Sequence, residues 1–116
     1  MMYSIRIVKP AQTDMREIYR YINDEWNDPI AAATRINLIN DGIQALKTMP
    51  GKFPLVRDSY LASKGFRAIP VKNHLVFFII REETKMVYVM RVLYARRDWA
   101  RVLKVDVDQI SDSFLL

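Results

Sequence analysis

Residues 65–94, GFRAIPVKNHLVFFIIREETKMVYVMRVLY, contain three apolar segments separated by two short polar ones. The apolar segments are 66–71, 74–81 and 86–94, joined by the polar residues 72–73 and 82–85. Connections this short join neighbouring strands that run in opposite directions. The stretch therefore predicts a three-stranded antiparallel meander, and the rest of the chain has to cover it.

The middle strand of this meander has the strongest signal. Residues 75–80 are uninterruptedly apolar, which is typical of a central strand covered on both faces. Pro70 lies in the strand before it and cannot donate a backbone hydrogen bond, so that strand is expected at an edge of the sheet.

The first half of the chain reads as a strand and two helices. Alternation over 3–7 predicts a strand that ends at Pro10. A helix capped by Thr13 or Asp14 follows and ends near Asn27, and Asp28 with Pro29 starts a second helix that Pro50 and Gly51 stop. The inward faces of the two helices carry Met15, Ile18, Tyr19, Ile22 and Trp26, and Ala32, Ile36, Ile39, Ile43 and Leu46, while Arg35 faces outward.

The remaining segments complete an α+β fold of order β-α-α-β-β-β-α. We expect a helical hairpin packed on a small four-stranded, mostly antiparallel sheet. Residues 51–64 show no period and are interpreted as a loop, and 95–104 as a short basic helix with Trp99 in the core. Residues 1–104 are expected to form a single domain, followed by an acidic and apolar C-terminal tail over 105–116.

Composition excludes several classes of protein. The chain of 116 residues has no Cys and one His, which excludes disulfide scaffolds, thiol nucleophiles and multi-histidine metal sites. We therefore expect neither a cofactor nor a metal. The longest apolar run has six residues, against about 20 for a transmembrane helix. With no secretion signal at the N-terminus, the chain is expected to be cytoplasmic and to have no membrane partner.

The positive charge of the chain is concentrated in its second half. The net charge is +5, but residues 64–104 carry ten Lys and Arg against three Asp and Glu, a balance of +7. Residues 1–63 carry eight against seven, and 105–116 none against three. A basic segment attracts phosphates, so the pattern favours a nucleic acid or another anionic partner.

The candidate functional residues lie in this basic segment. Cleavage of RNA by its own 2′-hydroxyl needs a proton acceptor, cations for the phosphate charge and a proton donor, and it needs no metal. We expect Arg67, Arg91 and Arg96 to hold phosphate charge and His74 or Tyr94 to transfer protons. Candidates for nucleic-acid contact are Lys64, Lys72, Arg97 and Arg101.

Ordinary structural roles compete with these assignments. His74 is typical of a turn, Tyr94 of packing at a strand end, and Arg96 and Arg97 of a solvated helix start. Strict alternation places Arg91 and Tyr94 on opposite faces of their strand, so they share a site only if the strand bulges near Leu93.

The chain resembles the RelE/ParE superfamily of toxins from bacterial type II toxin–antitoxin modules over about residues 3–103. The residues that carry the resemblance are Tyr21-Ile22, Asp28-Pro29 with Ala32 and Ala33, the run 46–50, Gly65-Phe66-Arg67, the run 73–77 and the run 91–99. The resemblance implies a compact basic toxin that a cognate antitoxin neutralises.

Two activities diverge within this superfamily. RelE-like and YoeB-like members cut mRNA on the ribosome, and ParE-like members inhibit DNA gyrase without cleaving RNA. The chain has His74 where RelE-like proteins have an Arg, and Leu93-Tyr94 where YoeB-like proteins have a His-Tyr pair. The leading hypothesis is a ribosome-dependent mRNA endoribonuclease; a gyrase inhibitor and a non-catalytic RNA-binding relative are the alternatives.

Overall fold

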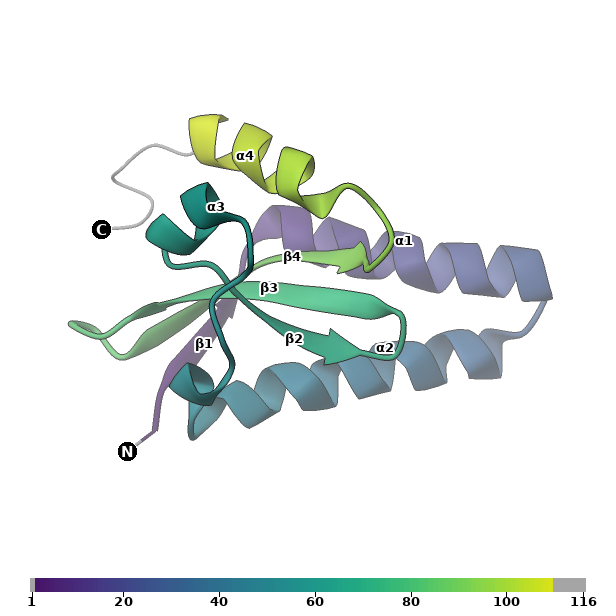
Figure 1. Ribbon diagram of the computed structural model, residues 1–116. Coiled ribbons are helices and arrows are strands. Elements are labelled where there is room, and N and C mark those ends of the chain that lie inside the picture. The colour runs from purple at the N-terminus through teal and green to yellow at the C-terminus, as the bar shows by residue number, and fades with distance from the viewer. Residues whose placement is uncertain (1, 110–116) are drawn as a thin grey trace.

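The first half of the chain folds into a short strand and a long helical hairpin (Figure 1). The structure is a computed structural model that describes residues 2–109. β1 (Ser4–Ile7) leads into α1 (Lys9–Trp26) and α2 (Pro29–Gln44). Asp28 caps α2, because its side chain accepts a hydrogen bond from the amide of Ala31 at 3.0 Å. The predicted hairpin is confirmed.

α1 begins earlier than the sequence predicted. It starts at Lys9, so Pro10 lies in the first helical turn, where its missing N–H costs nothing, and does not close the strand. Val8 occupies the N-cap position in place of Thr13 or Asp14. Asp14 is therefore free of a capping role, and its side chain is buried inside the fold.

The second half supplies the meander and two further helices. The 3₁₀ turns η1 (Ala45–Lys47) and η2 (Pro50–Lys52) precede α3 (Ser59–Ser63), β2 (Arg67–Val71), β3 (His74–Arg81), β4 (Met86–Tyr94) and α4 (Trp99–Gln109). The interpretation of 51–64 as a loop missed α3. A helix of five residues is too short to show a period, and Asp58 fixes it by accepting a hydrogen bond from the Leu61 amide at 3.0 Å.

The four strands form one mixed sheet in the order β1-β4-β3-β2. β1 runs parallel to β4, and the other two pairings are antiparallel. β3 is central and β2, which carries Pro70, is an edge strand, as predicted. The sheet is four-stranded and mostly antiparallel, so the expected α+β fold is confirmed in class and in element order.

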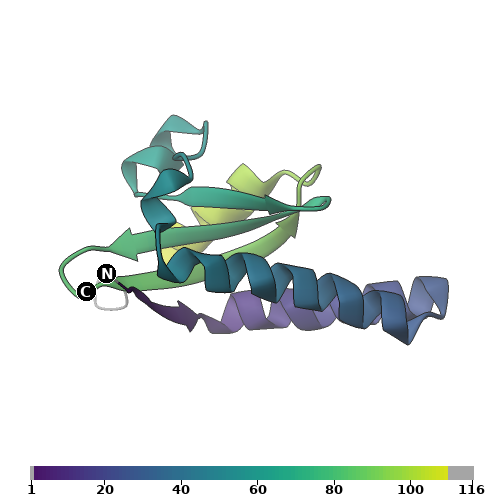
Figure 2. The same cartoon turned by 90° about the horizontal axis from the view of Figure 1, so that it is seen from below.

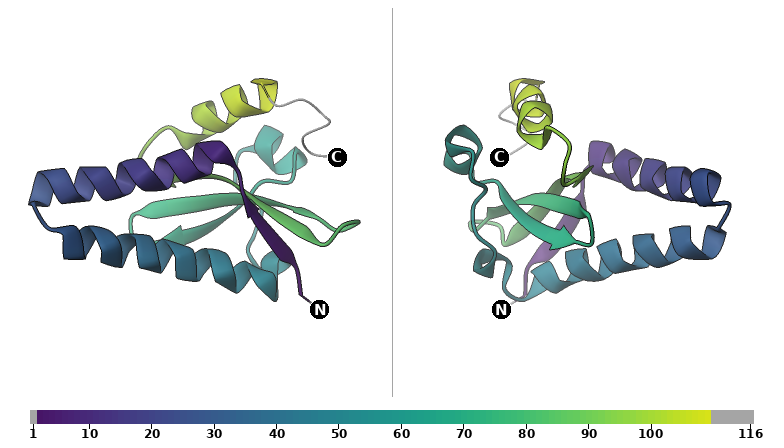
Figure 3. Two further views of the ribbon diagram at one scale, coloured as in Figure 1. Left: turned by 180° about the vertical axis from the view of Figure 1, so that it is seen from behind. Right: turned by 45° about the vertical axis from the view of Figure 1, so that its right-hand side comes forward.

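Helices cover both faces of this sheet. Figure 2 shows α1 and α2 along one face, and the two views of Figure 3 place α3 and α4 on the other side. Ile39, Ile43 and Phe77 are among the fully buried core residues. The hairpin tip projects beyond the sheet, so Trp26 is 63% exposed although its spacing placed it on the inward face.

α4 is shifted along the chain relative to the helix predicted over 95–104. Trp99 packs its ring against Phe77 with 5.1 Å between centroids, and Leu103 is fully buried, which fixes the start of the helix. Arg96 and Arg97 therefore lie in the turn before α4 and do not open it. Residues 105–109, expected in the tail, belong to α4, and 110–116 lie outside the described residues. Between residues 2 and 109, no helix is both long and apolar enough to span a membrane.

Candidate functional site

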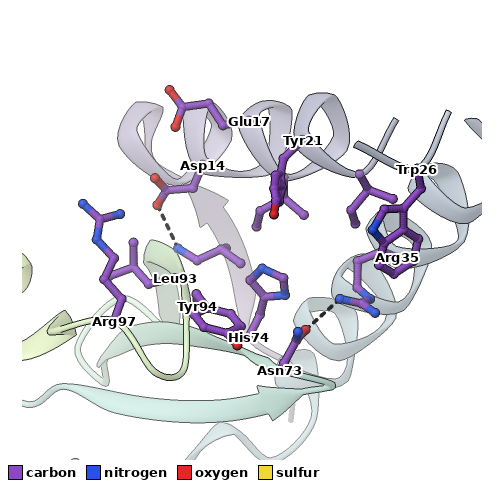
Figure 4. Close-up of a pocket in the computed structure, with 13 residues that line it drawn as sticks. Asp14, Glu17, Tyr21, Trp26, Arg35, Asn73, His74, Leu93, Tyr94 and Arg97 are labelled. Carbon is purple, nitrogen blue, oxygen red and sulfur yellow. Dashed lines mark hydrogen bonds between the residues drawn. The ribbon is translucent and has the colours of Figure 1, made fainter. Parts of the chain in front are cut away.

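A cleft of about 580 Å³ opens between the helical hairpin and the sheet, at the end where β3 begins and β4 finishes (Figure 4). We call it the hairpin cleft. One wall comes from α1, and the floor includes Val92 and Leu93 of β4. The residues that line it are Asp14, Glu17, Ile18, Tyr21, Ile22, Trp26, Arg35, Asn73, His74, Val92, Leu93, Tyr94 and Arg97.

The polar end of the hairpin cleft is built by α2 and the β2–β3 turn. Nη1 of Arg35 donates a hydrogen bond to Oδ1 of Asn73 at 2.8 Å, which holds the guanidinium at the cleft (Figure 4). The backbone carbonyl of Asn73 accepts a hydrogen bond from the Ala95 amide at 2.9 Å. This hydrogen bond joins the β2–β3 turn to the end of β4, so His74 and Tyr94 lie at the same end of the cleft.

His74 lies at the centre of this polar end. It pairs with Val71 of β2 and with Tyr94 of β4, and its ring meets the Tyr94 ring edge-on with 6.0 Å between centroids. Its side chain is buried, and its Nδ1 has no hydrogen-bond partner among the described residues. Burial, followed by the positive charge of Arg35, lowers the pKa of His74 below its ordinary value. The imidazole is therefore neutral at neutral pH.

Arg91 is paired with two carboxylates of its own chain. Its Nε and Nη2 donate to the two carboxylate oxygens of Asp14 at 2.7 and 2.8 Å, and its Nη1 donates to Oδ2 of Asp106 at 3.1 Å. Oδ2 of Asp14 also accepts a hydrogen bond from the Val92 amide at 2.9 Å. These contacts, led by the bond to Asp14, raise the pKa of Arg91 and keep it charged. The guanidinium joins α1, β4 and α4.

Arg67 lies far from His74 and has a different environment. Its Nη1 donates to the carbonyl oxygens of Phe53 at 2.5 Å and of Gly51 at 3.4 Å. It opens β2, whereas His74 pairs with the last residue of that strand, four positions on. At about 3.3 Å per residue the two backbones are about 13 Å apart. Arg67 therefore holds the loop before β2 in place and is not part of the hairpin cleft.

The structure groups the nine sequence candidates unevenly. His74, Tyr94 and Arg97 line the hairpin cleft. Arg96 and Lys72 are in the exposed turns at the same end of the sheet. The other four lie elsewhere. Arg67 opens β2, and Lys64 is the C-cap residue of α3, with its ammonium 5.6 Å from the centroid of the Tyr60 ring. Arg91 lies between α1 and α4, and Arg101 is on the exposed side of α4.

The strand register keeps Arg91 and Tyr94 apart. Arg91 pairs with Phe77 and Tyr94 pairs with His74, so they point to opposite faces, as strict alternation predicted. The irregularity in this pairing lies between Phe77 and Phe78, not near Leu93. The two residues therefore do not share a site.

Sequence reasoning missed three components of the hairpin cleft. Arg35 was placed on the outward face of its helix, Asp14 was interpreted as a cap, and Tyr21 was used only for the family resemblance. Tyr21 and Trp26 are 60% and 63% exposed at the rim. Among the described residues, no three His, Asp or Glu side chains are grouped as metal ligands.

Comparisons with known proteins agree with this architecture. The chain is similar to a protein of the chromosomal ParDE toxin–antitoxin system of P. aeruginosa, with 18% identity, a TM-score of 0.68, and coverage of 82% of this chain and 98% of that one. It is also similar to a mutant of the E. coli toxin RelE in the free state, with 14% identity, a TM-score of 0.65, and coverage of 96% of this chain and 100% of that one. A chain of the toxin–antitoxin complex RelBE2 of Mycobacterium tuberculosis has 18% identity and a TM-score of 0.58, with coverage of 81% of this chain and 99% of that one. At these identities the likeness establishes the fold.

The family is established by sequence. No curated protein sequence matches the chain. A family model does match residues 5–99, and it describes the ParE toxin of the type II toxin–antitoxin system parDE. The match spans β1 to the first residue of α4, and it agrees with the hairpin, the mixed sheet and the element order. The chain therefore belongs to the ParE toxin family of type II toxin–antitoxin systems.

Proposed function

We propose that this toxin acts by binding a protein target, DNA gyrase, and not by cutting RNA. The observation that carries the proposal is the state of Arg91. A nuclease that stabilises a pentavalent phosphate needs cations aimed at that phosphate, and Arg67, Arg91 and Arg96 are the cations that the sequence predicts for this role. Arg91 is instead bound by two carboxylates of its own chain. Arg67 is bound to loop carbonyls, and its backbone is about 13 Å from that of His74.

The family supports the same proposal. ParE-like members of the superfamily are gyrase inhibitors without nuclease activity, and the family model that matches this chain is that of ParE. Solved relatives include toxins bound to antitoxins. A cognate antitoxin is accordingly the second protein partner that we propose.

The competing function is the ribosome-dependent mRNA endoribonuclease. One observation favours it: His74 and Tyr94 are adjacent at the hairpin cleft, with Arg35 and Arg97 also lining it. A neutral imidazole beside a phenol is a suitable pair for proton transfer. This reading predicts RNA cleavage that depends on Tyr94.

Two assays on the purified chain separate these functions. In the first, gyrase supercoils relaxed plasmid in the presence of the toxin. In the second, a translation extract is programmed with one mRNA, and its 5′ ends are mapped. Inhibited supercoiling with intact mRNA supports the proposal. New mRNA ends that disappear with Tyr94→Phe, with supercoiling unaffected, would overturn it, and mRNA binding without new ends or gyrase inhibition would favour the non-catalytic RNA-binding relative.

A further inference from the structure

The polar end of the hairpin cleft is formed by Arg35, Asn73 and His74. Arg35 is held there by Asn73, and the Nδ1 of the buried His74 has no hydrogen-bond partner among the described residues. An unpartnered buried polar atom costs about 1–3 kcal/mol, and this cost is recovered when a ligand supplies the missing bond. Arg97, at the end of the cleft formed by the turn after β4, adds a second cation. Figure 4 shows Arg97 on the other side of His74 from Arg35, so Arg35 and His74 are the two side chains that fit one anionic group.

The rest of the hairpin cleft is apolar. Ile18, Ile22 and Trp26 of α1 line the wall, and Val92 and Leu93 line the floor. At about 580 Å³ the space is of the size that takes a few side chains or a small molecule. The occupant therefore combines one anionic group with apolar groups beside it.

The charges along α1 decide between a peptide and a nucleic acid. Asp14 and Glu17 line the same wall, and Asp14 is already paired with Arg91. A strand with a phosphate at every residue would pass the carboxylate of Glu17, which repels it. A peptide that presents a single carboxylate to Arg35 and apolar side chains to α1 avoids that repulsion.

We infer that the hairpin cleft recognises an acidic, apolar peptide segment of a protein partner, whose carboxylate binds Arg35 and His74 and whose apolar side chains lie on the α1 wall. The inference rests on the proposed function in one respect, that the partner is a protein. It goes further by naming the surface and the chemistry that this surface selects.

The test uses the full chain labelled with ¹⁵N and two matched peptides. The first is acetyl-Ala-Leu-Leu-Glu-Ala-Leu-Leu-amide, and the second has glutamine in place of the glutamate. Titration is followed by the indole N–H signals, because Trp26 lies at the cleft and Trp99 packs on Phe77. We expect the glutamate peptide to move the Trp26 signal and not that of Trp99, and to bind about tenfold more tightly than the glutamine peptide.

Variants assign this preference to one side chain. Arg35→Gln is expected to abolish the tenfold difference, and Arg35→Lys, which keeps the charge, to retain part of it. Arg20→Gln, on the exposed side of α1 and outside the cleft, is the matched control and leaves the preference unchanged. The amide spectrum of each variant shows directly whether it is folded.

Three outcomes would overturn the inference. The first is that the two peptides bind equally, and the second is that neither binds at millimolar concentration. The third is that adenosine 5′-monophosphate shifts the Trp26 signal, and loses this effect in Arg35→Gln, when the glutamate peptide does not shift it. None of them bears on gyrase inhibition, which has its own assay. A failure of the inference is therefore distinguishable from a failure of the proposed function.

Discussion

The pairing of Asp14 with Arg91 makes a quantitative prediction for the Asp14→Ala variant. The substitution removes two charge-assisted hydrogen bonds, at 2.7 and 2.8 Å, and the acceptor of the Val92 amide. The side chains of Asp14 and Arg91 are 7% and 16% exposed, so water replaces little of what is lost. Breaking a buried pair by removing one partner costs about 3–5 kcal/mol.

We expect the lower end of this range, about 3 kcal/mol, because Asp106 still accepts from Arg91 at 3.1 Å. A domain of this length has a free energy of unfolding of about 6–17 kcal/mol, so the variant loses a large share of it. The melting temperature falls by about 10 °C. Urea denaturation of the wild type and the variant measures the difference, and Asp108→Ala, on the exposed side of α4, is the control that changes stability by less than about 0.5 kcal/mol.

A double-mutant cycle separates this pairing from other effects of the substitution. Arg91→Met alone and in combination with Asp14→Ala completes the cycle, and a coupling energy of about 2 kcal/mol is expected. A cost below about 1 kcal/mol for Asp14→Ala, with negligible coupling, would refute the reasoning. It would mean that Asp14 holds Arg91 only weakly, and the main argument against the nuclease function would weaken with it.

Three further substitutions test other parts of the structure. His74 has a lowered pKa in the folded chain, so the unfolded chain binds the proton first as the pH falls; stability should decline below about pH 6.5 by at most about 1.4 kcal/mol per pH unit. His74→Phe should remove this decline in urea denaturation between pH 5 and 7, and parallel declines in both proteins would contradict the assignment. Arg67→Met, which frees the Phe53 carbonyl, should cost about 1–2 kcal/mol and speed proteolysis within 51–58 while leaving gyrase inhibition unchanged; a lost inhibition would return Arg67 to the functional site. Asp28→Ala should cost about 1 kcal/mol through the lost cap of α2, and an equal loss in Asp28→Asn, which can still cap, would argue against capping as the cause.

The predictability of the fold followed the strength of each local signal. The apolar run 75–80 and the pair Asp28-Pro29 carry backbone information that few neighbours can override, and the central strand and the start of α2 lie where they indicate. The start of α4 was misplaced by four residues, since it is fixed by the contact of Trp99 with Phe77, which no local pattern contains.

The candidate site was less predictable because its members come from different elements. His74, Tyr94 and Arg97 were named from their residue types, and the strand register brings them to one end of the sheet. Arg35 was missed because it reaches Asn73 across 38 positions of the sequence. The sequence gives a helix face for such a residue, but not the neighbour that this face meets.

The sequence by itself determined the four strands, the existence of α1, α2 and α4, and the basic character of the second half of the chain, because hydrophobic period, capping residues and charge are local properties. Only the tertiary structure decided which cations are free. Asp14 and Arg91 are 77 positions apart, and their pairing depends on α1 crossing beside β4. Charge is read from residues one at a time, whereas neutralisation depends on distance in space, and the fold alone sets that distance.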